Sequence, residues 1–356
     1  EPDWEHFKIF WEAAIKRVPA MEQSGINRFY VSAESFTPDN NYLMGEAPEV
    51  KNFFVAAGLN SSGIAAGAGV GKAVAEWIIA GYPTMDLAEV DISRFSTFHN
   101  GPSYLKDRIK ERVGSVYDMH WPHLQPKSAR NVRKSPLHIY HEKNGACFGE
   151  HAGWERPNWY APVGVEPIME YSYGKQNWFE YSAFEHNAVR NDVGLFDQTA
   201  FAKFIVQGND AEDVLQNICA NDVAVKVGTV VYTAMLNNRA GIEADVTVTR
   251  IETDKYLIVT SSSTATRDMT WIKRNIPENA HCFVTDVTSS YAVLGVMGPN
   301  SRELLSQVVD VDMSNEGFPY MTAQYMYLGY ISIKGFVCWR TGLGIIYPYG
   351  ICHKCL

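Results

Sequence analysis

The chain has 356 residues, of which 46% are apolar and 13% aromatic, enough to fill the cores of about two domains. Its net charge of −9 excludes nucleic acid as the main partner, because nucleic-acid-binding proteins usually carry a basic patch. Lys72 and Glu76 interrupt the longest apolar stretch, so no run of about 18 apolar residues remains and we expect no membrane span.

Metal-binding patterns are weak in this sequence. Cys352 and Cys355 form a single CxxC pair at the end of the chain, without the second pair that structural zinc sites use. His138 and His141 have a three-residue spacing but no further ligand at a set distance, so ordinary hydrogen-bonded histidines are favoured. We therefore expect no metal site.

The first thirty-six residues predict a helix followed by a strand. Trp4, Phe7 and Trp11 recur at intervals of three and four, which is typical of an apolar helix stripe over residues 3–18. Residues 26–36 (INRFYVSAESF) alternate between apolar and polar side chains, which predicts a strand.

Residues 53–81 predict a strand, a tight turn and a buried helix. The β-prone run FFVAAG meets a turn containing Gly58 and Gly63, and a helix of small and apolar side chains begins near Ile64. GAGVGK is not a Walker A motif, and the G-x-G-x-x-G fingerprint is also missing. Two interpretations remain: a helix whose small residues pack closely on a sheet, or a helix N-terminus aimed at an anion or a polar cofactor edge.

Residues 94–175 have a different character. The stretch SYLKDRIKERVGSVY predicts a charged amphipathic helix, and the Trp-, Pro- and His-rich stretch after it predicts a long irregular surface. Lys127, Arg130, Arg133 and Lys134 form a small basic run within it. This run indicates a solvated surface, or alternatively a docking site for an acidic partner.

From residue 178 the pattern becomes regular again. It predicts a helix, a strand near 201–207, and a second helix that begins after Asn209 and Asp210. The runs separated by NNRAG and ETDK then predict a three-stranded meander, followed by a helix, two strands and another helix.

Several strings resemble a known family. ESFTPDNNYLMGEAPEVKNFFVAAGLNSSGIAAGAGVGKAVAEWI resembles the end of the flavin-binding domain of dimethylglycine and sarcosine dehydrogenases, and SPLHIYHEKNGACFGEHAGWERPNWYAP resembles the segment that follows it there. FEHNAVRNDVGLFDQTAFAKFIVQG, YTAMLNNRAGIEADVTVTR and VLGVMGPNSRELL resemble the folate-binding aminomethyltransferase (glycine-cleavage T-protein) domain. The order of the pieces matches as well, and together they cover roughly residues 30–318.

The resemblance implies α/β and α+β architecture: the C-terminal part of a flavin-binding, D-amino-acid-oxidase-like domain, followed by a partial T-protein-like folate-binding domain. It divides the chain into the end of the oxidoreductase domain (1–93), a connecting segment (94–175), an incomplete aminomethyltransferase domain (176–318) and a divergent or truncated tail (319–356).

The resemblance also implies cofactor contacts. The turn that would sit against FAD comprises Gly58, Leu59, Asn60, Ser61 and Gly63, although the ADP-binding half of such a site would lie before residue 1. In the T-protein-like part, Asp245 matches an acid near the folate nitrogens and Tyr256 matches a wall of that pocket. Under an enzymatic function, Asp245 would be the catalytic residue, holding positive charge on an amine or moving a proton.

The family pattern changes near the end of the sequence. Arg340-Thr341-Gly342 begins to resemble a turn that binds the pterin ring in the family, but the expected Glu does not follow. The resemblance therefore implies a vestigial tetrahydrofolate site.

Three functions follow from the resemblance. The favoured one is a non-catalytic regulatory protein of the mitochondrial matrix that binds a phosphatase catalytic subunit and modulates dephosphorylation of the pyruvate dehydrogenase complex. The alternative is an FAD- and tetrahydrofolate-dependent oxidative demethylase of dimethylglycine- or sarcosine-type amines. The third is a folate-binding module alone.

Overall fold

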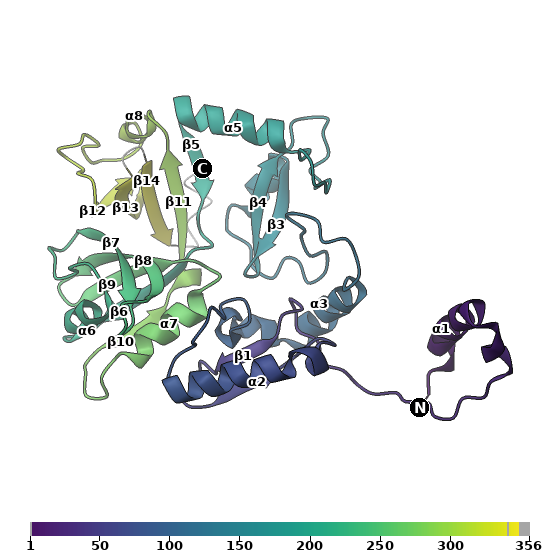
Figure 1. Ribbon diagram of the computed structural model, residues 1–356. Coiled ribbons are helices and arrows are strands. Elements are labelled where there is room, and N and C mark those ends of the chain that lie inside the picture. Colours follow the sequence, from purple (N-terminus) through teal and green to yellow (C-terminus); the bar gives the residue numbers. More distant parts are fainter. Residues whose placement is uncertain (1, 340–341, 349–356) are drawn as a thin grey trace.

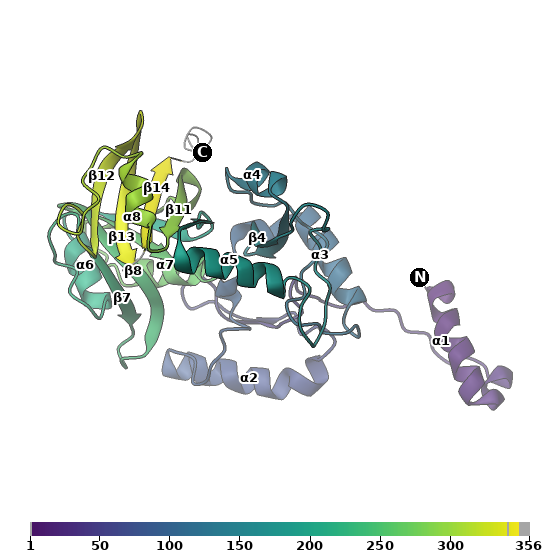
Figure 2. The same ribbon diagram turned by 90° about the horizontal axis from the view of Figure 1, so that it is seen from above.

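The computed structural model describes residues 2–339 and 342–348. In Figure 1, α1 (Trp4–Arg17) lies apart from the rest of the molecule at the end of an extended segment, and Figure 2 shows the same separation from above. Asp3 caps the helix by accepting a hydrogen bond from the His6 amide at 2.9 Å. A short 3₁₀ turn, η1 (Pro19–Gln23), follows, and the predicted first helix is confirmed.

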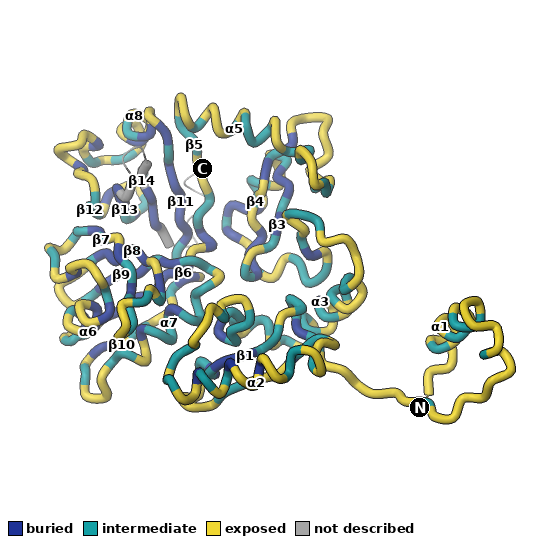
Figure 3. Tube along the Cα trace, in the orientation of Figure 1, coloured by how far each residue is buried: buried dark blue, intermediate teal, exposed yellow. Residues whose placement is uncertain are grey.

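The strand predicted over residues 26–36 is wrong. None of these residues belongs to a strand, and Tyr30 and Val31 are 77% and 60% exposed. Figure 3 shows this segment as almost continuously exposed. Alternation stabilises a strand only when a neighbouring strand pairs with it and one face is buried, and here the described residues provide neither.

The strand, turn and helix predicted at 53–81 are confirmed, but the prediction that the helix is buried is wrong, because only 17% of its residues are buried and Ile64 and Ile79 are exposed. β1 (Leu43–Glu46) pairs antiparallel with β2 (Phe54–Ala57), and α2 (Gly63–Ala80) follows. Val70, Ala73 and Trp77 are the buried residues of α2, and Val70 and Ala73 form a core cluster with Met44 of β1. The helix ends at Gly81, which takes the left-handed conformation that glycine allows.

By length and composition, α2 is also apolar enough to cross a membrane, with a mean hydropathy of 1.3 over 18 residues and 17% of them buried. The two charged residues Lys72 and Glu76, from which we expected no membrane span, do not make α2 too polar for this test. The core helix of a globular domain can pass the same test, so one such helix among the described residues is weak evidence for a membrane span.

The connecting part contains more regular structure than expected. It comprises η2 (Ile92–Arg94), η3 (Thr97–Asn100), α3 (Pro102–Gly114), α4 (His138–Lys143), β3 (Ala146–His151) and β4 (Trp154–Tyr160). β3 and β4 form an antiparallel pair with an irregularity between Cys147 and Phe148. This bulge and Pro157 interrupt the alternation from which a hairpin is recognised, although Trp154 and Trp159 are 2% and 1% exposed.

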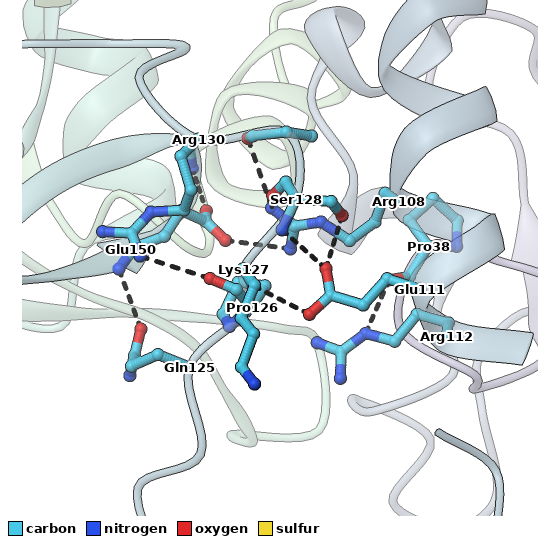
Figure 4. A network of polar contacts seen from close by, with 12 residues as sticks. Pro38, Arg108, Glu111, Arg112, Gln125, Pro126, Lys127, Ser128, Arg130 and Glu150 are labelled. Atoms are coloured by element: carbon cyan, nitrogen blue, oxygen red, sulfur yellow. Dashed lines mark hydrogen bonds and ion pairs between the residues drawn. The ribbon is translucent and has the colours of Figure 1, made fainter. Parts of the chain in front are cut away.

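A network of buried charges holds this part together (Figure 4). Arg108 of α3, with a side chain only 3% exposed, pairs with Glu150 of β3 at 3.2 Å and donates to the Ser128 carbonyl at 3.0 Å. Glu111, one turn further along α3, accepts hydrogen bonds from the amides of Lys127 and Ser128 at 2.7 and 2.8 Å. These contacts fasten an otherwise irregular segment between the helix and the hairpin.

The basic run is therefore not a solvated surface as a whole. Arg130 makes a two-bonded ion pair with Glu155, whose side chain is 2% exposed, and it also donates to the Phe148 carbonyl. Burial would raise the pKa of the Glu155 carboxyl, but the bonds from Arg130 and the Asn131 amide outweigh it and hold that pKa below its usual value.

The C-terminal part is built from two antiparallel sheets. Its helical elements are α5 (Phe179–Asn191), α6 (Ala211–Ile218), α7 (Ala265–Arg274), η4 (Thr288–Ser290) and α8 (Ser301–Ser306). Its strands are β5 (Gly194–Asp197), β6 (Ala202–Gln207), β7 (Val230–Leu236), β8 (Ile242–Glu252), β9 (Lys255–Thr260), β10 (Phe283–Asp286), β11 (Tyr291–Met297), β12 (Thr322–Leu328), β13 (Ile331–Trp339) and β14 (Gly342–Pro348). The strand orders are β10-β6-β9-β8-β7 and β12-β13-β14-β11-β5, which confirms the predicted meander.

The two sheets pack against each other and carry helices on their outer faces. Ile205, Val230 and Leu257 of the first sheet meet Val293, Phe336 and Ile346 of the second in one cluster. A larger core lies between the first sheet and helices α6 and α7, and another lies beneath α8. Arg274 at the end of α7 joins this part to the N-terminal one by contacting Glu46 at 2.5 Å and the Ala47 carbonyl at 2.9 Å.

Lys203 of β6 gives the fold a measurable pH dependence. It is 0% exposed, its ammonium donates to the carbonyls of Thr199 and Phe201, and burial lowers its pKa from 10.5 to about 8. Between these values the unfolded chain binds the proton and the folded chain does not, so the unfolding free energy rises with pH, by about 3 kcal/mol in all.

We expect the Lys203→Met variant to lack this rise. Urea unfolding at pH 8 and at pH 10.5 gives the change in unfolding free energy with pH for the parent and for the variant. All other titrating groups contribute equally to the two proteins, so the difference between these changes is due to Lys203. Equal pH slopes for the two proteins would contradict the assignment.

Candidate functional site

A cavity of about 390 Å³ lies between the two sheets of the C-terminal part. Its walls come from β8 and β9 on one side, from β11, β13 and β14 on the other, and from the segment that leads into α7. It is lined mainly by apolar atoms, with a small number of polar groups among them. This is the composition of a small-molecule site.

Strand alternation places Asp245 in this cavity. Ala244, Val246 and Val248 of β8 are 2%, 2% and 1% exposed and belong to the core beneath α6 and α7. Because side chains alternate across a strand, Asp245, Thr247 and Thr249 point to the opposite face, and all three line the cavity. The predicted site residue Asp245 thus lies at the wall of the cavity, where it remains exposed to solvent.

Tyr232 of β7 is the nearest polar partner of Asp245. Its hydroxyl donates to Asp245 Oδ2 at 2.7 Å, across the β7–β8 ladder in which Ala234 pairs with Asp245. The hydrogen bond to this carboxylate raises the pKa of Tyr232. An aromatic hydroxyl two residues from the cross-strand position can be found only once the register is known, so no pattern in the sequence indicated it.

A buried carboxyl supports the far side of the cavity. Asp268 of α7 is 1% exposed and accepts hydrogen bonds at 2.6 Å from the hydroxyls of Thr260 and Thr264, both of which line the cavity. Burial raises the pKa of Asp268 despite these bonds. Arg267, beside it, also lines the cavity and lies 3.3 Å from Asp268. The site therefore presents an anionic side chain, Asp245, and a cationic side chain, Arg267, which is itself paired with Asp268.

The structure does not bring Tyr256 to this cavity. Tyr256 is 0% exposed on the α6 side of β9, within the same core as Ile258, while its neighbours Leu257 and Val259 face the second sheet. Its hydroxyl donates to Glu212 of α6 at 3.2 Å, and burial raises its pKa to about 12. Because side chains alternate along β9, a difference of one position determines whether a residue faces the second sheet or the core beneath α6.

The flavin-like turn is fastened by its own side chains. Asn60 donates to the Gly58 carbonyl at 2.6 Å and accepts from the Thr37 amide at 2.8 Å, and the Ser61 hydroxyl bonds to Glu34 at 2.7 Å. Leu59 packs against the core beneath α2, which begins at Gly63. The side chains thus hold the loop, so a ligand here would meet backbone N–H groups at the start of α2.

Of the two histidines at three-residue spacing, only His141 is hydrogen-bonded as expected, because His138 Nδ1 is buried without a partner among the described residues and its Nε2 lies 4.0 Å from Glu142. His141 lies 3.1 Å from Asp197 of β5 and 2.7 Å from the Tyr160 hydroxyl. No group of three or more His, Cys, Asp or Glu side chains with metal-binding geometry occurs within residues 2–339 and 342–348. Arg340, Thr341, Cys352 and Cys355 lie outside the described residues.

Comparison with known proteins assigns three family models along the chain. Residues 1–77 match the FAD dependent oxidoreductase family, residues 80–135 match the FAD dependent oxidoreductase central domain, and residues 137–342 match the GCVT N-terminal domain. The expected fold class, flavoprotein-like segments followed by an aminomethyltransferase domain, is confirmed. An aminomethyltransferase T structure from Bartonella henselae agrees in fold, with a TM-score of 0.50 and 24% identity over 63% of this chain and 56% of that one.

Three relatives share most of this chain. It is 48% identical to 4-methylaminobutanoate oxidase (formaldehyde-forming) of Paenarthrobacter nicotinovorans and 34% identical to mitochondrial sarcosine dehydrogenase of Homo sapiens, each over 90% of this chain. It is 32% identical to the mitochondrial pyruvate dehydrogenase phosphatase regulatory subunit of Mus musculus over 92% of this chain. The chain spans 39%, 39% and 38% of the length of these relatives.

Two glycines test how strictly the flavin-like turn is shaped. Gly58 and Gly81 have positive φ angles of +62° and +79°, but a Cβ on Gly58 would lie 2.5 Å from the Thr37 methyl, whereas one on Gly81 would meet nothing within 4 Å. Gly81→Ala should cost about 1–2 kcal/mol from backbone strain alone. Gly58→Ala should cost about 1–3 kcal/mol more, because the turn must also move away from Thr37. Chemical denaturation of the two variants measures the difference, and equal losses would refute it.

Proposed function

This chain belongs to the GCVT N-terminal domain family, and we propose that it takes part in the flavin- and folate-dependent oxidative demethylation of a small methylated amine. The observation that carries this proposal is Asp245 on the wall of the cavity between the sheets, in a chain 48% identical to a 4-methylaminobutanoate oxidase (formaldehyde-forming). The similarity to sarcosine and dimethylglycine dehydrogenases supports the same reaction class.

Asp245 has the chemistry that such a reaction needs. A carboxylate at the wall of a largely apolar cavity stabilises a cationic amine or iminium and can accept its proton. Tyr232 donates its hydroxyl to Oδ2, which keeps the carboxylate oriented and leaves Oδ1 for the substrate. Arg267 supplies a positive charge at the same cavity, and Asp268 orients the hydroxyls of Thr260 and Thr264. These polar groups would suit a ligand that carries both carbonyl and amine groups.

The proposed cofactors are FAD and tetrahydrofolate. When bound, the flavin would oxidise the N-methyl group and the folate would take up the released one-carbon unit. Asp245 and the cavity would serve the folate-dependent step, and the turn from Gly58 to Gly63 would serve the flavin through its backbone. The relatives named as mitochondrial support a mitochondrial location.

We expect Asp245→Asn to separate the two steps of the reaction. With 4-methylaminobutanoate or sarcosine as substrate, transfer of the one-carbon unit to tetrahydrofolate should fall by about a hundredfold or more. Flavin reduction should keep its rate, so free formaldehyde should accumulate instead of methylene-tetrahydrofolate. Stopped-flow bleaching of the flavin and trapping of formaldehyde measure the two steps.

Glu243→Gln is the matched control. Glu243 lies two residues before Asp245 on β8 and is bonded to Asn237 at 2.7 Å, and it does not line the cavity. This variant should behave as the parent protein. Unchanged folate loading in Asp245→Asn would exclude Asp245 from the folate-dependent step, and a colourless protein without turnover would exclude the enzymatic proposal.

A regulatory role is the second proposal, supported by the 32% identity to a pyruvate dehydrogenase phosphatase regulatory subunit. In that case the partners would be the phosphatase catalytic subunit and, through it, the pyruvate dehydrogenase complex. The 48% identity to an oxidase makes it the weaker of the two. A pull-down with the purified catalytic subunit, followed by a phosphatase assay over a range of divalent-cation concentrations, tests it. Failure to bind, with an unchanged cation response, would exclude the role.

A further inference from the structure

A second cavity, separate from the one that contains Asp245, lies where the three parts of the chain meet. It has a volume of about 300 Å³. Its charged and hydrogen-bonding residues come from the loop after β1, from η3, from the connecting part, from α7 and from β10, and include Glu49, Thr97, Arg133, Trp154, Lys273 and Asp286. Neither proposed function uses this cavity.

Arg133 is held rigidly at the wall of this cavity. Its amide donates to the Gly153 carbonyl and its carbonyl accepts from the Glu155 amide, both at 2.9 Å, so the backbone is fixed to the edge of β4. The guanidinium carbon lies 5.0 Å from the centre of the Phe98 ring and 5.7 Å from that of Trp154. Both rings lie within cation–π distance of the guanidinium and restrict its position at the cavity wall.

The guanidinium of Arg133 has no acceptor of its own. Arg108 and Arg130, its neighbours in the connecting part, are paired with Glu150 and Glu155. For Arg133, no carboxylate of the described residues lies within the 4.0 Å of an ion pair, and none of their oxygens accepts a hydrogen bond from its side chain. Burial lowers the pKa of Arg133, with the charge of Asp286 acting in the opposite direction from further away.

Trp154 provides a second donor without an acceptor. The residue is 2% exposed, lines the same cavity, and its indole Nε1 is buried with no hydrogen-bond partner among the described residues. Buried donors are almost always satisfied in folded proteins. The indoles of Trp159, Trp178 and Trp271 also lack partners among the described residues, so the indole alone does not indicate a ligand. Its position beside the unpaired guanidinium of Arg133 at the same cavity indicates a ligand that supplies oxygen atoms.

The charges around the cavity select among oxygen ligands. Arg133, Lys273 and Arg274 are cationic, and Arg274 is already paired with Glu46. Glu49 and Asp286 line the same space and would repel a dianion such as phosphate more strongly than a monoanion. A carboxylate carries one charge and two oxygens at the spacing of the guanidinium fork. We propose that this cavity binds a small monocarboxylate, with its oxygens on Arg133 and the Trp154 indole.

Binding of propionate to the purified protein tests the proposal without turnover, so its result does not depend on the proposed reaction. We expect calorimetry to give a dissociation constant in about the millimolar range. Arg133→Met, which keeps the aliphatic stem between the two rings, should weaken binding about tenfold to a hundredfold, and Arg133→Lys should recover only part of it.

Arg156→Met is the matched control, because Arg156 also lies on β4 but lines a different cavity. It should bind propionate as the parent protein does. Equal binding by Arg133→Met and the parent, or no binding by the parent, would overturn the proposal. Tighter binding of inorganic phosphate than of propionate would overturn the assigned ligand class.

The Trp154 indole provides a measurement on the parent protein that does not depend on whether an Arg133 variant folds. In ¹⁵N-correlated NMR spectra of the parent protein, with the resonance assigned through Trp154→Phe, the indole N–H signal should shift downfield as propionate is added. Propanol at the same concentration should leave it in place. An indole N–H signal that does not shift when propionate is added would contradict the proposed contact between Trp154 and the carboxylate.

Discussion

The burial of Ala244, Val246 and Val248 on one face of β8 determines what the other face can offer. These side chains lie in the core beneath α6 and α7, and their removal from water makes any shift in register costly. A slip of one residue would place the carboxylate of Asp245 in that core without a partner. Apolar packing on one face of the strand therefore sets the register of β8, and the register sets the position of Asp245 on the other face.

Three arginines determine how the parts of the chain fit together. Arg108 ties α3 to β3, Arg130 ties the irregular segment to β4, and Arg274 ties α7 to the loop after β1. Each has a carboxylate partner, which compensates the loss of hydration of its charge. Arg133 occupies the same region without one. This contrast separates arginines that hold the fold from one that is available to a ligand.

The two cavities differ in what they recognise. The one between the sheets lies in the GCVT N-terminal domain, with Gly344 and Ile346 from just beyond the matched residues, and offers a carboxylate, Asp245, which suits a cationic or amine-bearing ligand. The one at the meeting of the three parts offers N–H donors, which suit a carboxylate. An enzyme that handles amino acids with N-methyl groups has use for both kinds of recognition, whereas binding to a phosphatase subunit requires neither. The physical character of the sites thus agrees with the closer identity to the oxidase.

The sequence by itself determined the local elements and the domain types. The strand, turn and helix at 53–81, the meander at 230–260 and the position of Asp245 followed from periodicity, turn residues and family resemblance, which depend on neighbours along the chain. Tertiary structure decided the rest. Whether residues 26–36 form a strand depends on a partner strand, which is absent from the described residues, and the face on which Tyr256 lies depends on strand register. Arg130 and Arg133 look alike in a basic run, but one meets a carboxylate and the other two aromatic rings. The physical reason is that pairing, burial and charge compensation are properties of residues far apart in sequence, and only the folded chain brings them together.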